Sequence, residues 1–246
     1  GVYCEVPSNP LLRSADLPKI SSILSPLEIP LIVDDTVATN VNVDVFKYAD
    51  LATTSLTKYY SGVGDVIAGA VTINRDSVHR SRLNALLSEQ EGSGIWHEDA
   101  IVLKDNAADY RDRVLRVNDT TPELVEWLRN HDAVEKVWYP KYETRDNYDA
   151  VRKEEGGFSG LFSILLKNPE NNSPAFYDSL ELCKGPSLGV EFTIVCPYTL
   201  LAHYDELDWC EGLGVSRWLL RVSVGQESYE YIRARFAKSL DSLTEN

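Results

Sequence analysis

Several features that would mark other classes of protein are absent from this sequence. It contains no methionine, and its four cysteines and four histidines are scattered without close pairs. Zinc sites and redox dithiols require such pairs at short spacing, so we expect no metal centre. We interpret the cysteines as small, reduced residues of a reducing compartment.

Positive charge and long hydrophobic runs are also scarce. Lysine and arginine total 24 against 38 acidic residues, which gives a formal net charge of −14 at pH 7. This excess argues against nucleic acid or an anionic membrane as a general partner, although local donors could still bind a phosphate. No apolar run has the length needed to span a bilayer. We therefore expect a soluble, cytoplasmic protein that binds small molecules.

The sequence does contain two apolar runs that each end in polar residues. Residues 30–33 lead into Asp34, and residues 49–57 lead into Lys58. We interpret both runs as strands of an open α/β sheet. Ligands bind beyond the carboxyl ends of such strands, so Asp34 and Lys58 should face one site.

This pair has a specific chemical use with pyridoxal phosphate. A buried carboxylate such as that of Asp34 favours the protonated ring nitrogen of the cofactor. A partly desolvated amine such as that of Lys58 can form a Schiff base with its aldehyde. Ser55 and Thr57 would place two hydroxyls toward the phosphate. Taken alone, the motif could equally be a chance match around a solvated lysine.

Further blocks of sequence resemble one family, the Cys/Met-metabolism enzymes that depend on pyridoxal phosphate. The resemblance lies in five ordered blocks, residues 5–11, 33–36, 55–62, 184–189 and 220–227. Within the family the chain is similar to the fungal cystathionine gamma-synthase type. That character comes from Asp35, where bacterial relatives have asparagine, and from residues 157–163 and 197–204.

The resemblance implies a role for each of several residues around the cofactor. Lys58 would form the Schiff base, Asp34 would pair with the pyridine nitrogen, and Ser55 and Thr57 would hold the phosphate. Asn9 would contact the ring hydroxyl oxygen, unless residues 9–10 form only a turn.

The resemblance also implies residues that bind the substrate. Arg221 would grip the α-carboxylate through a bidentate fork, and Ser187 would lie in the loop that closes over it. Either could instead be structural, as a strand-edge charge or a loop hydroxyl. Arg221 lies among apolar residues, where a charge needs a partner. His203 would lie near the site.

The implied reaction is γ-replacement on an O-acylated homoserine, with cysteine as the thiol nucleophile and cystathionine as the product. Residues 190–192 depart from the family pattern, which leaves sulfide or a carbon nucleophile, or γ-elimination, as alternatives. A different alternative is a truncated, non-catalytic fragment that acts only as a structural subunit. The family also implies a homodimer or homotetramer with the active site at the subunit interface.

The predicted fold is α/β, with two domains. Residues 1–118 would form part of a cofactor-binding large domain, a mostly parallel sheet with helices on both faces. Residues 119–246 would form a smaller α+β domain. The family's large domain extends ahead of Gly1, so we expect a C-terminal portion of a longer polypeptide. Beyond the site we predict strands at residues 66–73, 134–139, 161–166 and 218–224, and helices at 77–88, 99–117, from 121, 175–182 and 227–243.

Overall fold

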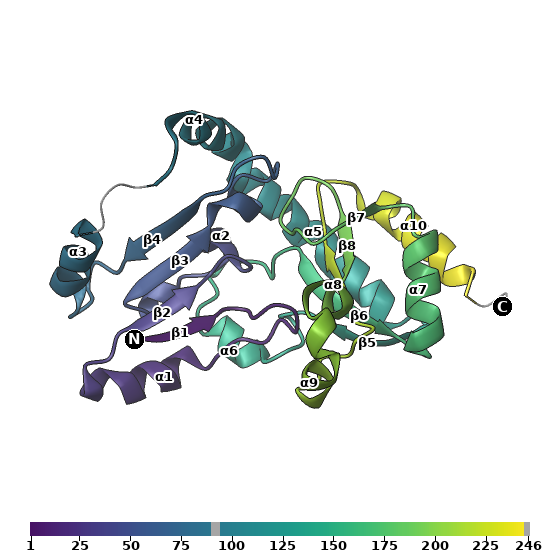
Figure 1. Cartoon of the computed structure of the whole chain (residues 1–246), viewed down its shortest axis with the longest axis horizontal. Helices are drawn as coiled ribbons and strands as arrows, with labels where there is room; N and C mark the ends of the chain where they lie inside the picture. The colour runs from purple at the N-terminus through teal and green to yellow at the C-terminus, as the bar shows by residue number, and fades with distance from the viewer. Residues whose placement is uncertain (90–93, 244–246) are drawn as a thin grey trace.

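The computed structural model describes residues 1–89 and 94–243 and contains two β-sheets (Figure 1). Over these residues the first sheet has the order β1, β2, β3, β4, with bounds Val2–Glu5, Leu31–Asp34, Leu51–Ser55 and Gly69–Ile73. The first three strands are parallel, and β4 pairs antiparallel with β3. Asp34 of β2 lies opposite Thr53 of β3, so the carboxyl ends of these strands lie side by side.

Short helices connect the strands of the first sheet. Helix α1 (Leu17–Leu24) begins after Asp16, whose carboxylate accepts a hydrogen bond from Lys19 N at 3.0 Å. The 3₁₀ turn η1 (Ser25–Leu27), helix α2 (Thr39–Asn42) and the 3₁₀ turn η2 (Val45–Lys47) follow. Alternate residues of β2, Leu31 and Val33, enter a hydrophobic core. The connecting segments contribute Leu17, Val43 and Val45 to the same core.

The strand predicted up to Lys58 is shorter than expected. β3 ends at Ser55, and Leu56–Tyr60 form one π-helical turn, η3, within which Lys58 is non-helical with φ −85° and ψ −126°. The turn closes on itself because Ser61 N and Gly62 N donate to the carbonyls of Leu56 and Lys58 at 2.9 and 2.8 Å. Lys58 therefore lies on a tight turn beyond the strand.

Strand β4 differs from the buried strand predicted over residues 66–73. It begins at Gly69. Over the described residues it is the outer strand of the sheet and pairs with β3. Val71 is half exposed, and β4 contains no fully buried residue.

The first helix after β4, α3 (Arg80–Ser88), confirms the helix predicted at residues 77–88, with a later start. The next elements depart from the prediction and are α4 (His97–Asn106), the 3₁₀ turn η4 (Ala107–Asp109) and α5 (Tyr110–Arg129). The predicted helix 99–117 is thus divided, and the prediction of a new helix at Thr121 is wrong because α5 continues through Pro122. Proline removes one helical donor, but buried residues from Val114 to Leu128 on both sides of it hold α5 together.

The second sheet is mostly antiparallel, as predicted. Over the described residues its order is β5, β6, β9, β8, β7, with bounds Val134–Trp138, Leu161–Leu166, Leu220–Ser223, Ile194–Pro197 and Cys183–Lys184. Only the β7 and β8 pair is parallel among the described pairings. The strands predicted at 134–139, 161–166 and 218–224 are confirmed with small shifts at their ends, whereas β7 and β8 were not predicted.

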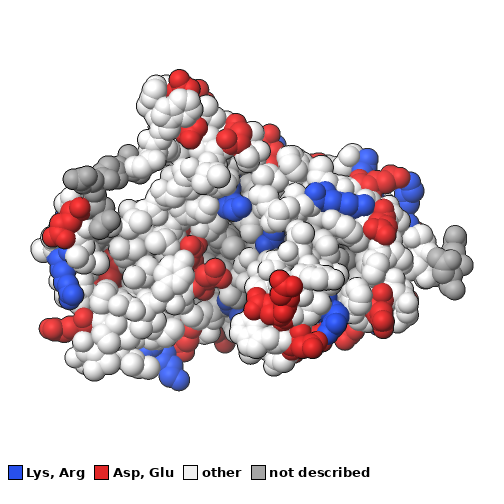
Figure 2. Space-filling model, viewed as in Figure 1, with Lys and Arg blue, Asp and Glu red and all other residues white. Residues whose placement is uncertain are grey.

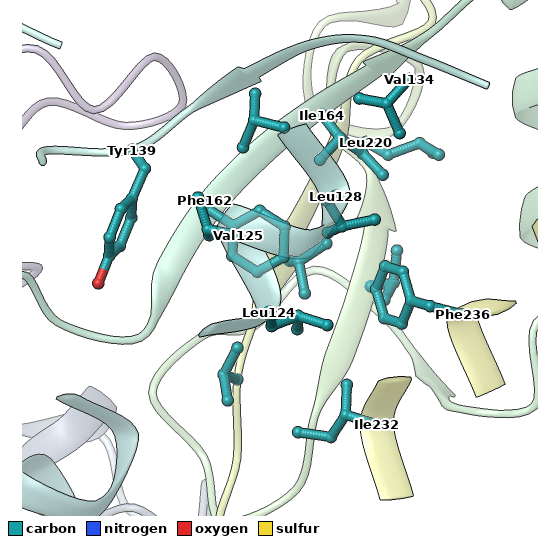
Figure 3. Close-up of a cluster of buried hydrophobic side chains, with 14 of the residues drawn as sticks. Leu124, Val125, Leu128, Val134, Tyr139, Phe162, Ile164, Leu220, Ile232 and Phe236 are labelled. Carbon is teal, nitrogen blue, oxygen red and sulfur yellow. The ribbon is translucent and has the colours of Figure 1, made fainter. Parts of the chain in front are cut away.

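Three helices cover this second sheet and close its core. They are α5, α7 (Pro169–Ser179) and α10 (Tyr229–Asp241). α10 confirms the helix predicted at 227–243, whereas α7 begins and ends earlier than the helix predicted at 175–182. Figure 3 shows where side chains from α5, β6 and α10 meet, with Leu124, Leu128, Phe162, Ile164 and Phe236 among those labelled. This core fixes β9, the strand that carries Arg221.

The remaining short helices are α6 (Arg145–Asp149), α8 (Tyr198–Ala202), the 3₁₀ turn η5 (Tyr204–Glu206) and α9 (Leu207–Gly212). The residues around α6 return to the first sheet, where Tyr148 and Val151 are fully buried in its core. Asn118 links both units, since its Nδ2 donates to Asn42 Oδ1 at 2.7 Å and its Oδ1 accepts from Ser159 N at 3.1 Å. The predicted boundary after residue 118 falls inside α5, and the division into two domains stays a prediction.

The surface carries charges of both signs. Figure 2 shows acidic and basic side chains interspersed over one face of the molecule. Within residues 1–89 and 94–243, no helix combines the length and apolar character needed to cross a membrane.

Candidate functional site

Asp34 ends β2, and three donors hold its carboxylate. Tyr3 OH and Thr53 Oγ1 donate to Oδ2 at 2.9 and 3.2 Å, and Thr36 N donates to Oδ1 at 2.9 Å. Tyr3 lies on β1 and Thr53 on β3, so the strands on both sides of β2 support the carboxylate. These contacts fix its orientation at the carboxyl edge of the sheet.

Thr36 joins the ends of β2 and β3, because its Oγ1 accepts a hydrogen bond from Ser55 N at 2.7 Å. Farther along, Thr57 Oγ1 accepts from Ala68 N at 3.0 Å and donates to Ala68 O at 3.3 Å. A hydroxyl has a single hydrogen, so Thr57 must release this carbonyl before it can donate to a phosphate. The phosphate-binding roles of Ser55 and Thr57 stay predictions.

Lys58 reaches from the η3 turn toward the second sheet. Its Nζ lies 3.5 Å from Ser187 Oγ, in the loop between β7 and β8. Half-burial of the amine lowers the pKa of Lys58, and the positive charge of Arg221 lowers it further. Both effects disfavour the ammonium form, which makes the neutral, nucleophilic amine accessible at lower pH.

Arg221 lies on β9 and is only 4% exposed. Its Nη1 donates to Asn9 Oδ1 at 3.1 Å, and its Nη2 donates to the carbonyls of Pro186 and Ser187 at 2.5 and 3.2 Å. The guanidinium also lies over the Tyr198 ring, 5.0 Å from its centre. Burial lowers the pKa of Arg221, although an arginine remains charged throughout the physiological range.

Asn9 connects Arg221 to the first sheet. Its backbone N donates to Glu5 Oε2 at 3.1 Å, and its Nδ2 donates to Tyr198 OH at 3.5 Å. Glu5 lies opposite Asp34 in the pairing of β1 with β2. Burial raises the pKa of Glu5, the Asn9 hydrogen bond opposes this, and the charge of Asp34 adds to it.

Asp35 lies beside Asp34 in sequence and has its own partner. It is 4% exposed, and Thr54 Oγ1 donates a hydrogen bond to its Oδ1. Burial raises the pKa of Asp35 to about 6, while the Thr54 hydrogen bond partly opposes this shift.

The structure therefore brings most of the predicted residues together. One connected set joins Lys58, Ser187, Arg221 and Asn9. Asp34 lies at the neighbouring strand end and reaches Ser55 through Thr36, whereas the Thr57 hydroxyl is turned to Ala68. His203 lies one step farther out, with its ring 5.7 Å from that of Tyr198.

Sequence reasoning missed the residues that support this set. Tyr3 and Glu5 are two residues apart on β1. The side-chain period of two along a strand could have placed both on one face. Tyr198 had no comparable signal, because its contacts with Asn9 and Arg221 are long-range.

The donor set fits pyridoxal phosphate. A half-buried lysine amine of lowered pKa suits the aldehyde, and the carboxylate of Asp34 suits a protonated ring nitrogen. A buried guanidinium suits the carboxylate of an amino acid. Among the described residues, no group of three or more His, Cys, Asp and Glu side chains could hold a metal ion.

Comparison with known proteins extends the resemblance over nearly the whole chain. Residues 1–241 match the family described as Cys/Met metabolism PLP-dependent enzyme. The chain is 41% identical over 241 residues to a cystathionine gamma-synthase of Neurospora crassa, covering 98% of this chain and 39% of that protein. It is 37% identical over 264 residues to a cystathionine gamma-synthase-like enzyme of Amanita muscaria, covering 98% and 43% respectively. It thus spans about two fifths of these curated relatives.

A solved structure has the same fold. The chain aligns with a cystathionine gamma synthase from Xanthomonas oryzae pv. oryzae, in complex with aminoacrylate and cysteine, with a TM-score of 0.86 and 25% identity. The alignment covers 99% of this chain and 63% of that one. The predicted α/β fold class is confirmed.

Proposed function

This chain belongs to the Cys/Met metabolism family of enzymes that depend on pyridoxal phosphate, and from that premise we propose that it carries the lysine-bearing part of a γ-replacement enzyme. The proposed reaction exchanges the γ-acyloxy group of an O-acylated homoserine for the thiolate of cysteine and gives cystathionine. The observation that carries this proposal is the Lys58 amine, which has a lowered pKa and lies 3.5 Å from the hydroxyl of Ser187, whose carbonyl accepts a hydrogen bond from the buried Arg221.

The cofactor would be held by residues at or just beyond the carboxyl ends of β1, β2 and β3. Lys58 would attach it covalently through its amine, Asp34 would accept a hydrogen bond from its ring nitrogen, and Ser55, Thr57 and Asn9 would contact its polar substituents. When bound, pyridoxal phosphate supplies an electron sink for the negative charge left by removal of the α-proton.

Lys58 would then act as a base. Its free Nζ would take the α-proton of the bound substrate and carry protons to and from the β-carbon. Its lowered pKa supports this role, because a base must be neutral before it can accept a proton.

Arg221 would bind the α-carboxylate of the substrate with its planar fork. Its guanidinium is buried and held in place by Asn9 and the carbonyl of Pro186, which limits its rotation. Ser187, on the same loop as that carbonyl, would cover the bound carboxylate.

The test is a visible absorption spectrum followed by borohydride reduction. We expect an absorption band in the visible range, and after reduction a mass increase located on Lys58. Lys58→Ala should lose the band and lower kcat by several orders of magnitude, while Lys19→Ala, at an exposed lysine on α1, should keep both. Turnover by Lys58→Ala would exclude the proposed mechanism. A wild-type protein without the band would instead favour a non-catalytic structural subunit.

A second proposal keeps the cofactor and changes the nucleophile to sulfide or a carbon nucleophile, or the outcome to γ-elimination. One feature that favours it is Phe192, which is 42% exposed in the segment 190–192 that departs from the family pattern. Product analysis with O-acylated homoserine plus cysteine, sulfide or neither separates these outcomes.

We further propose a cytoplasmic homodimer or homotetramer with the active site at the subunit interface. Several large apolar side chains between residues 63 and 102 are solvent-exposed, among them Ile67, Trp96 and Ile101, which suits burial against another surface. All four cysteines are free thiols, as expected in a reducing compartment. Sedimentation measurements with and without pyridoxal phosphate test the assembly.

A further inference from the structure

Arg113 is a buried cation that the proposed reaction does not use. It lies on α5 and is 5% exposed. Its guanidinium donates to five acceptors, namely Asp109 Oδ1 at 2.7 Å and the carbonyls of Tyr59, Tyr60, Ser61 and Asn106 at 2.9, 3.0, 3.1 and 2.9 Å. A buried charge is tolerated only with such partners, so the position of Arg113 is strongly determined.

Three of these acceptors are consecutive carbonyls that follow Lys58 directly in the chain. Carbonyls at the end of a helical turn lack partners within the turn, and cationic side chains often bind them. The planar fork of arginine reaches all three at once, which the single ammonium of a lysine does not. The fit is close, because a Cβ atom added to Gly62 would lie 1.8 Å from Arg113 Nη1.

A ring of hydrogen bonds extends this contact to the substrate side of the site. Gln226 Nε2 donates to the Arg113 carbonyl at 3.3 Å, and Gln226 N donates to the Glu191 carbonyl at 2.7 Å. Glu191 N in turn donates to the Gly62 carbonyl at 2.8 Å. Gln226 follows β9, the strand of Arg221, and Glu191 lies in the same loop as Ser187. The ring therefore joins the turn of Lys58 to the two segments that carry Ser187 and Arg221.

We infer that Arg113 is a positioning residue, which holds the Lys58 turn by its three carbonyls and sets the lysine amine against Ser187 and Arg221. The inference rests on the proposed function only in that Lys58 is taken as the reacting lysine. Asp109 contributes less to this fixation, because its side chain is 61% exposed and water screens the ion pair.

The test compares Arg113→Lys with Arg152→Lys. Arg152 is a matched control, since it also pairs with an aspartate, Asp149, and donates to a backbone carbonyl, Gly156 O, outside the site. The first readout is hydrogen exchange of the Ser61 and Gly62 amides, which close the turn around Lys58. The second is the separation of kcat from KM in the holoenzyme, and the third is the pH dependence of Lys58 acylation after cofactor removal.

For Arg113→Lys we expect faster exchange at Ser61 and Gly62 and a kcat lowered about 10²-fold, since a shift of about 1 Å in a reacting group costs that much. KM should change less, because Arg221 and Ser187 remain. Acylation of Lys58 should shift to higher pH as water reaches the amine. Arg152→Lys should change none of these readouts, even where its melting temperature falls.

Wild-type exchange and an unchanged acylation profile in Arg113→Lys would overturn the inference and leave Arg113 a stabilising residue. Should this variant not fold, Gln226→Met keeps the side-chain length and removes only the donor to the Arg113 carbonyl. It should speed exchange at Gly62, and wild-type exchange there would equally overturn the inference. Hydrogen exchange can be measured without the cofactor. A wild-type protein without the visible band would show failure of the proposed function, whereas wild-type exchange in the variants would show failure of this inference.

Discussion

Arg221 lowers the pKa of Lys58 although Arg221 lies on the second sheet and Lys58 on the turn that follows β3 of the first. Ser187 lies between them, with its Oγ 3.5 Å from Lys58 Nζ and its carbonyl oxygen 3.2 Å from Arg221 Nη2. The basicity of the lysine therefore depends on how the second sheet is seated against the first.

Arg221→Met should raise the pKa of Lys58. Burial is the larger cause of the lowered pKa, and the positive charge of Arg221 is the second. Removal of that charge therefore leaves only the effect of burial. The neutral amine is the reactive form, and acylation of Lys58 in cofactor-free protein should need higher pH in the variant. Mass spectrometry of labelled peptides across a pH series gives the midpoint. Arg217→Met, which removes a surface partner of Glu211, is the control, and equal midpoints in both variants would contradict the prediction.

Asp35→Asn should stabilise the protein at neutral pH. A carboxyl whose pKa is raised by folding binds its proton more tightly in the folded state. Stability therefore falls as pH rises from the pKa of the unfolded state to that of the folded state. A pKa moved from 3.8 to about 6 corresponds to a loss of about 3 kcal/mol above pH 6, and to none below the unfolded value. Asparagine can still accept the Thr54 hydrogen bond, and it avoids this loss.

Urea unfolding of wild type and Asp35→Asn at pH 3.5 and pH 8 measures this difference. The free energies of unfolding should be similar in acid and should diverge at pH 8 in favour of the variant. A difference that does not change with pH would rule out the buried carboxylate as its source.

Gly189→Ala should disturb Lys58 from the opposite side of its turn. Gly189 has φ +71°, and an added Cβ would lie 2.6 Å from the backbone N of Tyr59, the residue after Lys58. We expect a loss of stability greater than about 1 kcal/mol, because the conformation itself disfavours alanine. Cofactor retention, read from the visible band after dialysis, should fall. Gly212→Ala, where the added atom meets open space, should leave both properties unchanged.

The sequence predicts local features of this molecule well. The strands at 30–33 and 161–166 are short, mostly apolar runs with clear ends, and Asp34 and Lys58 follow from strand ends and cofactor chemistry. Prediction of β8 failed because Ile194–Pro197 is short and ends in proline, so neighbours rather than composition determine that strand. The error at Pro122 has a related origin, since tertiary burial of α5 overrides the preference of proline for a first turn.

The supporting contacts of the site could not be predicted in the same way. Asn9 and Arg221 are separated by 212 positions, and their hydrogen bond depends on the packing of both sheets. Arg113 reads from sequence as one charged residue of a polar helix, and only the fold brings Tyr59, Tyr60 and Ser61 to it. The position of the Thr57 hydroxyl was predicted from alternation along a strand. The strand ends at Ser55, so that alternation does not extend to Thr57.

The return of Tyr148 and Val151 to the core of the first sheet has a consequence for how the chain unfolds. A cut inside α5 would leave the first sheet without two of its buried side chains, although both lie far beyond the cut in sequence. The two halves are therefore interlocked and should not melt independently. Heating should produce one cooperative transition, and neither half expressed separately should regain its full structure.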